Sequence, residues 1–545
     1  MSRVLILGGY GVFGGRLARL LLADGHDVTV AGRSIDKARR FCRRWGGRPL
    51  ALDRFGPLDA FEGVEVVVDA SGPFQATGDD PYRAARAALS AGAHYLDLSD
   101  DAGFTTGIAA LDEEAKAVGR VALSGVSSVP ALSAAAVHAL AEGLDRIDLI
   151  ESAILPGNRA PRGRAVMGSI LAQAGEPMVL YRDGRTETAT GWSDPAPFTL
   201  APGLTRRARL IGAPDLSLFP RAFDARTVLF RAGLELWPLR AGLAALSAGR
   251  ARGLLPRLTR FLPILQPLAA LFAPFGSDRG GMVVRVVGPR AGKIVERRWH
   301  LLAERGEGPF VPAIPARALI PRLDALPPGA RPCLAELTLD AAEAALADRE
   351  ITCTRQSERP ARLFATVADL ELEALPPPVR DLHAVHDRRI FTGRARVERG
   401  RAPLARLAAW LFRFPSAGHD SRVSVRMQRD GDGERWERSF DGNRFRSHLR
   451  VSDGRMTERF GPFTFTLGLH IADGALHFPV TAGRIGPVPI PRALLPRSTA
   501  REYLDGQRAA FDVALDLPLG LGRVVRYRGW LDPMDEALAL DAQDR

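Results

Sequence analysis

Residues 3–23 read RVLILGGYGVFGGRLARLLLA and decide the fold. The apolar, β-branched run at residues 3–7 predicts a buried strand, and residues 12–23 predict the helix that follows it. Short β-branched runs continue to alternate with helical stretches as far as residue 124. Strands that alternate with helices of about ten to fifteen residues are typical of repeated βαβ units. The sequence therefore predicts an α/β fold with a parallel sheet of Rossmann type, covered by helices on both faces.

Glycines fill the corner between the first strand and its helix. Gly9 allows a tight turn, Gly11 lets the backbone approach a pyrophosphate, and Gly14 lets the helix pack closely on the strand. The N-terminus of the helix faces the same corner, and its N–H groups attract anions. We therefore predict that this corner, including Val12 and Phe13, binds the diphosphate of a dinucleotide; the alternative is a purely structural glycine turn.

The second predicted strand ends in VTVAGRS, residues 28–34. A site that prefers NAD carries Asp or Glu at this point to hold the ribose hydroxyls. Here the chain offers Arg33 and Ser34, and a guanidinium and a hydroxyl suit a 2′-phosphate, whose negative charges a carboxylate would repel. The residues therefore predict NADP rather than NAD. The alternative is that Arg33 only stacks on adenine or pairs at the surface.

Three polar segments follow the later strands of the predicted sheet. They read DASGPF at residues 69–74, DLSDD at residues 97–101 and SGVSSVP at residues 124–130. Because ligands bind at the carboxyl ends of parallel strands, these segments would surround the nicotinamide and its substrate. Ser71 and Gly72 are the expected cofactor contacts.

Asp97 and Ser99 are the candidate catalytic residues, because they could orient a substrate amine or carbonyl. Helix capping and turn formation explain Asp and Ser at such positions equally well. The three segments contain no obvious acid–base pair.

The 545-residue length suggests about three to four domains or large subdomains. Residues 1–130 form the predicted nucleotide-binding domain, and residues 131–355 a mixed α/β substrate domain. Within the latter, residues 280–306 alternate apolar and polar side chains about a turn and predict a β-hairpin. Residues 373–536 carry short alternating runs separated by Asp-Gly turns, which predict antiparallel hairpins in a curved sheet or barrel. Apolar residues on its strands, such as Phe463, Phe465, Leu467 and Leu469, are interpreted as core, with a stripe that lines a ligand site as the alternative.

The formal net charge of +12 raises the question of nucleic acid binding. The basic excess is spread evenly, with no polybasic run, so we expect no nucleic acid partner. Three widely spaced cysteines predict neither a disulfide framework nor a metal cluster and indicate a reducing compartment, with the cytoplasm as the default. His383 and His386 lie three residues apart but have no matching third ligand, so no metal is expected.

The most apolar later stretch is Leu254–Gly276, which contains two arginines and four prolines. It falls short of the roughly 20 clean apolar residues that a membrane-spanning helix needs. The expected structure is a buried helix broken by prolines. An interfacial patch in contact with membrane or lipid stays open as the alternative.

The motifs GGYGVFG, AGRS, DASGPF, YLDLSDD and GVSSVP, in this order and at these spacings, resemble the N-terminal part of the saccharopine dehydrogenase (saccharopine reductase-like) family. The resemblance implies an NADP-binding Rossmann domain followed by a mixed α/β substrate domain. It also implies cofactor contacts at Gly9, Gly11, Gly14 and Arg33. The last region resembles a bacterial domain family of unknown function that is often fused behind such oxidoreductases.

Two functions from different classes are compatible with these observations. The first is a cytoplasmic NADP-dependent oxidoreductase that moves a hydride to or from the carbon of a C–N, C=O or activated C=C bond of a small-molecule substrate. The second is a nucleotide-binding scaffold whose C-terminal β domain holds a hydrophobic ligand or partner without turnover. A homodimer is compatible with both.

Overall fold

The computed structural model describes residues 1–545 apart from 76–77, 162–163, 292, 359–362, 369 and 535–545. The chain divides into two compact units, Met1–Glu358 and Arg359–Arg545. The sequence predicted three domains, at residues 1–130, 131–355 and 373–536, and this division remains a prediction.

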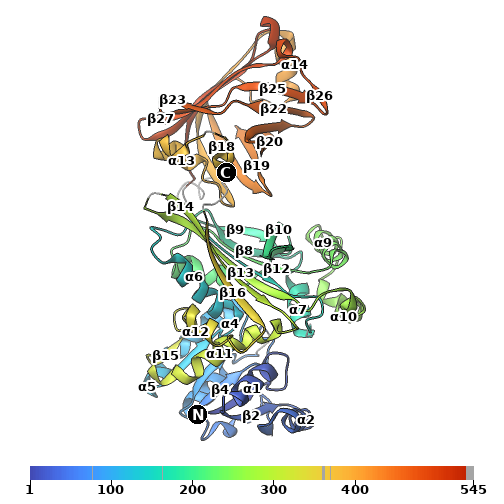
Figure 1. The fold of residues 1–545 in the computed structure, drawn as a ribbon, viewed down its shortest axis with the longest axis vertical. Coiled ribbons are helices and arrows are strands. Elements are labelled where there is room, and N and C mark those ends of the chain that lie inside the picture. Colours follow the sequence, from blue (N-terminus) through green and yellow to red (C-terminus); the bar gives the residue numbers. More distant parts are fainter. Residues whose placement is uncertain (76–77, 162–163, 292, 359–362, 369, 535–545) are drawn as a thin grey trace. The chain divides into compact units, whose positions relative to one another are not determined.

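A seven-stranded parallel sheet forms the N-terminal part of the first unit (Figure 1). Its strands are β1 (Arg3–Leu7), β2 (Asp27–Gly32), β3 (Arg48–Ala51), β4 (Val66–Asp69), β5 (His94–Asp97), β6 (Val121–Ser124) and β15 (Gly329–Pro332). They lie in the order β15-β6-β5-β4-β1-β2-β3, and each neighbouring pair is parallel. The strands β1 to β6 thus have the order of a dinucleotide-binding fold. The predicted Rossmann-type sheet is confirmed.

Both faces of this sheet are buried. Val4 and Ile6 belong to one apolar core, whereas Leu5 and Leu7 belong to another. A strand that is buried on both faces needs apolar side chains at successive positions, which explains the unbroken run in β1. The helices between these strands are α1 (Gly14–Ala23), α2 (Ile35–Trp45), α3 (Arg83–Ser90), α4 (Ala102–Gly107) and α5 (Asp112–Ala117), and α6 (Ser133–Ala141) follows β6.

A nine-stranded mixed sheet forms the rest of the first unit. Its main path runs β10-β11-β12-β7-β13-β14-β16, with β8 and β9 attached to β12. The predicted hairpin at residues 280–306 is confirmed, because β13 and β14 pair antiparallel along their whole length. The strands are β7 (Leu149–Leu155), β8 (Pro177–Arg182), β9 (Arg185–Thr190), β10 (Ala196–Ala201), β11 (Leu204–Leu210), β12 (Val228–Gly233), β13 (Gly280–Arg290), β14 (Lys293–Ala303) and β16 (Ile351–Glu358).

The apolar stretch Leu254–Gly276 differs from its prediction. It forms the proline-containing helix α10 (Leu262–Leu271), but no residue of α10 is buried. The side chains of Ile264 and Leu271 are 67% and 68% exposed. The prediction of a buried helix is therefore wrong, and the interfacial patch stays a prediction. Among the residues that the structure describes, no helix is both long and apolar enough to cross a membrane.

The remaining helices of the first unit pack on or beside its sheets. They are α7 (Arg164–Gln173), α8 (Asp215–Ala222), α9 (Trp237–Ala251), α11 (Ile314–Leu319) and α12 (Leu339–Ala344).

The second unit is a thirteen-stranded antiparallel sheet that curves strongly (Figure 1). The predicted hairpins are confirmed, and their Asp-Gly turns explain the tight reversals. Asp441 and Gly442, between β19 and β20, both have positive φ, at 46° and 89°. This backbone suits a two-residue turn between twisted strands, and Asp and Gly tolerate it. Figure 1 shows helices α13 (Pro377–Leu382) and α14 (Pro403–Leu411) at opposite ends of the long strands.

The strands of this sheet alternate along the chain with short turns. They are β17 (Arg388–Arg399), β18 (Gly418–Asp430), β19 (Gly433–Phe440), β20 (Asn443–Ser452), β21 (Arg455–Phe460), β22 (Phe463–Leu467), β23 (His470–Ala472), β24 (Ala475–His477), β25 (Val480–Ile485), β26 (Val488–Pro489), β27 (Arg497–Asp505), β28 (Arg508–Asp516) and β29 (Arg523–Pro533).

Two identical substitutions test where leucines are buried in the first unit. Leu17→Ala in α1 removes a fully buried side chain, so we expect it to lower the free energy of unfolding by ~2–5 kcal/mol. Leu271→Ala in α10 removes an exposed side chain and should change it by less than ~0.5 kcal/mol. Urea unfolding followed by circular dichroism measures both. An equally large loss for Leu271→Ala would contradict the exposed position of α10.

Candidate functional site

The glycine corner after β1 leaves no room for a side chain at Gly8, Gly9 or Gly14. Gly8 has a φ of +70°, and a Cβ there would lie 2.8 Å from the carbonyl oxygen of Ala70, which follows β4. A Cβ at Gly14 would lie 2.4 Å from the Gly8 oxygen. A Cβ at Gly9 would lie 2.8 Å from the carbonyl oxygen of Ile6. The corner therefore packs directly against the end of β4.

The left-handed residue of this corner is Gly8, which the sequence motif did not single out. We expected Gly9 to make the tight turn, but the positive φ lies one residue earlier. Gly11 is exposed at the tip of the loop, and its N–H donates to the Gly8 oxygen at 2.8 Å. Val12 and Phe13 are half-buried where the loop enters α1. The corner thus presents backbone and a helix N-terminus, the groups that suit a diphosphate.

Tyr10 joins the glycine corner to the end of β2. Its hydroxyl accepts the Ser34 N–H at 3.0 Å. Its ring lies over Gly32, where a Cβ would come within 2.5 Å of the ring. The sequence prediction missed Tyr10, although an aromatic residue inside a glycine loop was a visible signal. The contact fixes the end of β2 beside the corner.

The two residues predicted to bind a 2′-phosphate differ in their surroundings. Arg33 is exposed, and it forms no ion pair with any residue that the structure describes. The Ser34 side-chain oxygen accepts the Lys37 N–H at 3.4 Å and so caps α2. The guanidinium of Arg33 is therefore available to an anion at this edge, while Ser34 also has a structural role.

Asp69 organises the turn after β4. Its carboxylate is fully buried and lies 3.1 Å from the guanidinium of Arg54. The N–H and the hydroxyl of Ser71 both donate to the same Asp69 oxygen. Ser71 thus holds the turn that carries Gly72, and both residues stay predicted cofactor contacts. The sequence prediction missed Arg54, because nothing local pairs it with Asp69.

Asp97 ties the ends of β5 and β6 together. Its Oδ1 accepts the Ser99 N–H at 3.0 Å, the Ser124 hydroxyl at 2.9 Å and the Gly125 N–H at 2.9 Å. Its Oδ2 is buried and has no hydrogen-bond partner among the described residues. Burial raises the pKa of Asp97 from 3.8 to about 7, although the three hydrogen bonds favour the charged form.

Ser99 is also fully buried, within the turn after β5. Its hydroxyl oxygen accepts the Asp101 N–H and the Thr105 hydroxyl, each at 3.1 Å. Neither Asp97 nor Ser99 therefore has an exposed polar atom in this structure. Their predicted catalytic role stays a prediction.

His383 and His386, where no metal was expected, are both buried in the second unit. His383 Nε2 lies 2.6 Å from Glu502 Oε2, and its ring clusters with those of Phe364 and Trp436, with centroids 4.0 Å and 6.2 Å away. Across the described part of the chain, no three His, Cys, Asp or Glu side chains form a group that could hold a metal.

Two family models match parts of the chain. Residues 4–123 match the saccharopine dehydrogenase NADP binding domain, and residues 375–531 match a domain of unknown function, DUF4166. No curated protein matches the chain. The resemblance drawn from the motifs is thus confirmed: the chain carries a saccharopine dehydrogenase NADP-binding domain at its N-terminus and DUF4166 at its C-terminus. The first match supports an NAD(P)-dependent oxidoreductase that binds a nicotinamide dinucleotide.

Several solved structures are similar to part of this chain. Apo saccharopine dehydrogenase (L-Glu forming) from Saccharomyces cerevisiae is 14% identical with a TM-score of 0.49, over 66% of this chain and 100% of that chain. Homospermidine synthase from Legionella pneumophila in complex with NAD is 11% identical with a TM-score of 0.44, over 66% and 92%. Biliverdin reductase from Synechocystis in complex with biliverdin and NADP⁺ is 13% identical with a TM-score of 0.28, over 63% and 96%.

A methyl group at Gly14 tests the corner as a binding site. Gly14→Ala should weaken NADPH binding roughly tenfold or more, because the loop must move and a shift of about 1 Å disrupts such a site. Gly242→Ala in α9 is the control, since apart from its chain neighbours and its own helix backbone no described atom lies within 4 Å of its new Cβ. Fluorescence titration measures both. Equal affinity of a folded Gly14→Ala variant and the wild type would contradict the role of the corner.

The raised pKa of Asp97 predicts a pH dependence of stability. A carboxyl whose pKa is higher in the folded state stabilises the fold at low pH and loses this contribution as the pH rises from about 4 to about 7. At ~1.4 kcal/mol per pKa unit, the loss is a few kcal/mol. Asp97→Asn should therefore lose less stability than the wild type between pH 5 and pH 7 in urea unfolding.

Asp59→Asn is the control for this measurement, because Asp59 is exposed in the same unit. It should keep the pH dependence of the wild type. Parallel curves for the wild type and Asp97→Asn would show that Asp97 does not titrate in this range.

Proposed function

We propose that this chain is an NADP-dependent oxidoreductase that transfers a hydride to or from the carbon of a C–N, C=O or activated C=C bond in a small-molecule substrate. One observation carries the proposal. The glycine corner after β1 is joined through Tyr10 to the end of β2, where Arg33 is exposed without an ion pair to any described residue. When bound, the nicotinamide supplies or accepts the hydride.

The residues at the corner fit a dinucleotide. Gly11 and Gly14 let a diphosphate approach the backbone, and the N–H groups at the start of α1, near Val12 and Phe13, favour its charge. Arg33 would hold the 2′-phosphate of NADP, which no carboxylate at the end of β2 repels. This preference for NADP over NAD is part of the proposal.

The ends of β4 and β5 form the substrate side of the proposed site. Ser71 and Gly72 would contact the cofactor, with Asp69 holding their turn. Asp97 and Ser99 would position the backbone after β5 and β6, because their polar groups already bind that backbone. A carboxyl with a pKa of about 7 also retains or releases a proton near neutral pH.

A second function is supported by the burial of the same two residues. Asp97 and Ser99 are fully buried, so no acid–base pair faces a substrate from these positions. This favours a nucleotide-binding scaffold without turnover. Oxidation of NADPH in the presence of a panel of carbonyl, imine and activated alkene compounds separates the two: turnover of any of them excludes the scaffold.

Reversing the charge at the end of β2 tests the cofactor preference. Arg33→Asp should weaken NADPH binding by roughly 10- to 100-fold, the value of one charge-assisted hydrogen bond, and should leave NADH binding within about threefold. Arg39→Asp makes the same charge change at another exposed arginine, in α2, and should have little effect on either. Fluorescence titration with both cofactors measures the ratio. Equal NADPH binding by wild type and Arg33→Asp would contradict the proposal.

A further inference from the structure

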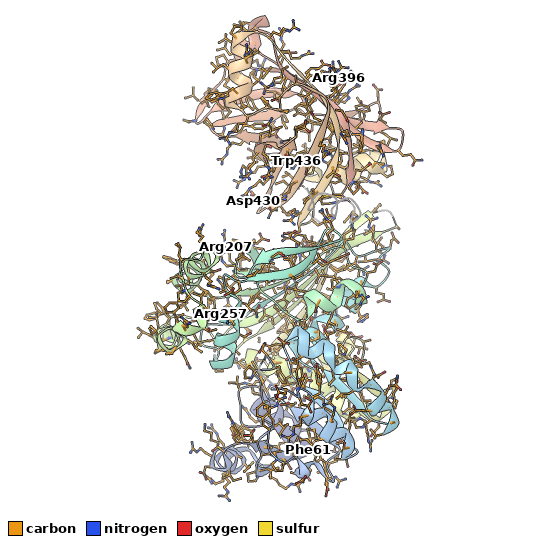
Figure 2. All side chains as sticks on the ribbon, turned by 180° about the vertical axis from the view of Figure 1, so that it is seen from behind. Phe61, Arg207, Arg257, Arg396, Asp430 and Trp436 are labelled. Atoms are coloured by element: carbon orange, nitrogen blue, oxygen red, sulfur yellow. The ribbon has the colours of Figure 1, made fainter. Side chains whose placement is uncertain are left out.

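The curved sheet of the second unit encloses an apolar cavity of about 470 Å³. Its volume lies within the roughly 300–1,000 Å³ of small-molecule sites. Figure 2 shows Trp436, one of its wall residues, between Arg396 and Asp430, which mark the two ends of the long strands. Further wall residues are Phe440, Phe445, Phe463, Phe465, Phe511 and Tyr527.

These walls correct the interpretation of one strand. Phe463 and Phe465 on β22 were expected to be core, but they line the cavity; Leu467 lines it too and is also part of the core, as expected. Leu469 alone among the four packs against the core without lining the cavity. An alternating strand pattern shows which side chains face inward, but it does not show whether the interior is filled.

The charged side chains on the described walls are paired within the protein. Arg438 Nη2 lies 3.1 Å from Glu458 Oε1, and Arg438 also donates to the Ser447 hydroxyl at 2.9 Å. Glu502 pairs with His383 at 2.6 Å. Because these charges are already compensated, the walls favour an uncharged, apolar occupant.

One end of the cavity carries exposed apolar side chains on α14. Ala408 of α14 lines the cavity, as does Phe412 directly after it. The opposite face of this helix is exposed, with Trp410 at 74%. Exposed with it are Leu404, Leu407 and Leu411. The helix thus covers the cavity with one face and presents an apolar surface with the other.

The strand register brings further exposed segments to the same end. Phe463 pairs with Ile485 at the end of β25, and its ring lies 5.1 Å from that of Phe412. Ile485 and Leu494 both line the cavity, although they are 46% and 49% exposed. The cavity therefore opens to the surface at the α14 end of the sheet.

Exposed arginines lie on the segments that reach this opening. Within the described part of the chain, six of them form no ion pair: Arg401, Arg406 and Arg413 in or beside α14, Arg484 beside Ile485, and Arg492 and Arg497 on either side of Leu494. An apolar surface bordered by unpaired cations is complementary to a bilayer with anionic head groups, which accepts the apolar side chains and attracts the charges. We call this surface the rim. It comprises Leu404, Leu407, Trp410 and Leu411 of α14, together with Ile485, Leu494 and the six arginines.

We propose that the second unit docks its rim on an anionic membrane surface and takes one long-chain lipid from it into the cavity. The lipid chain would fill the space between the aromatic walls. The arginines of the rim would bind the anionic head groups of the bilayer during transfer. The proposal does not depend on the oxidoreductase activity, because it uses only residues of the second unit.

Vesicle binding by the full chain tests docking. The probes are vesicles of phosphatidylcholine with and without phosphatidylserine, and the readout is co-sedimentation. The double variant Leu407→Ser, Trp410→Ser should lower binding to the anionic vesicles at least ~10-fold, since it removes two exposed apolar side chains. Removal of phosphatidylserine should lower it for the wild type. Unchanged binding in either case would overturn the proposal.

The exposed helix α10 of the first unit provides the control for docking. The double variant Ile264→Ser, Leu271→Ser makes similar changes at side chains that are also exposed, and it should leave vesicle binding in place. Loss of binding in this variant alone would assign docking to α10 and overturn the proposal. NADPH binding is measured for every variant, so that failure of docking and failure of the proposed function remain distinguishable.

Lipid uptake is tested by filling the cavity. After incubation with vesicles and re-purification, mass spectrometry should find phospholipid in the wild type and at least ~10-fold less in Ala514→Phe, which adds a ring to the cavity wall. If this variant does not fold, Ala408→Trp, at a half-buried wall position, replaces it. The control Ala482→Phe changes an exposed alanine of β25. Full loading of a folded, filled variant would overturn the proposal.

Discussion

The candidate site depends on one contact, between the glycine corner and the end of β4. Gly8 and Ala70 meet so tightly that a side chain at Gly8 would collide with backbone, and Gly14 closes on Gly8 in turn. At Gly8 and Gly14 the corner can therefore present only backbone atoms. The start of α1, the turn held by Asp69 and the end of β2 held by Tyr10 all take their positions around this corner.

Much of the fold could be predicted from local sequence patterns. The alternation of apolar strands and helices up to residue 124 predicted the parallel sheet, and Asp-Gly turns predicted the antiparallel one. Each of these signals lies within one or two elements. The strand β15 gave no such signal, because it joins β6 from some two hundred residues further along the chain through a register that only the folded structure defines.

The candidate site was predictable in its location but not in its contacts. The motifs placed Ser71, Asp97 and Ser99 at the ends of neighbouring strands, where the structure has them. The ion pair of Arg54 with Asp69 joins residues from different elements, so no local spacing shows it. The same limit explains the error at α10: its apolar composition resembles that of a buried helix, and composition does not show which neighbours the chain supplies.

The position of β15 has a consequence for how the first unit is assembled. Since β15 lies at the outer edge of β6, the nucleotide-binding sheet is built from two separate stretches of chain. The backbone between them leaves the sheet after β6, forms β7 to β14 of the mixed sheet and returns. A fragment cut after residue 130 would expose the edge of β6, with its unsatisfied backbone groups open to intermolecular pairing. The ribosome must therefore synthesise the chain as far as β15, at residues 329–332, before the nucleotide-binding sheet can be completed.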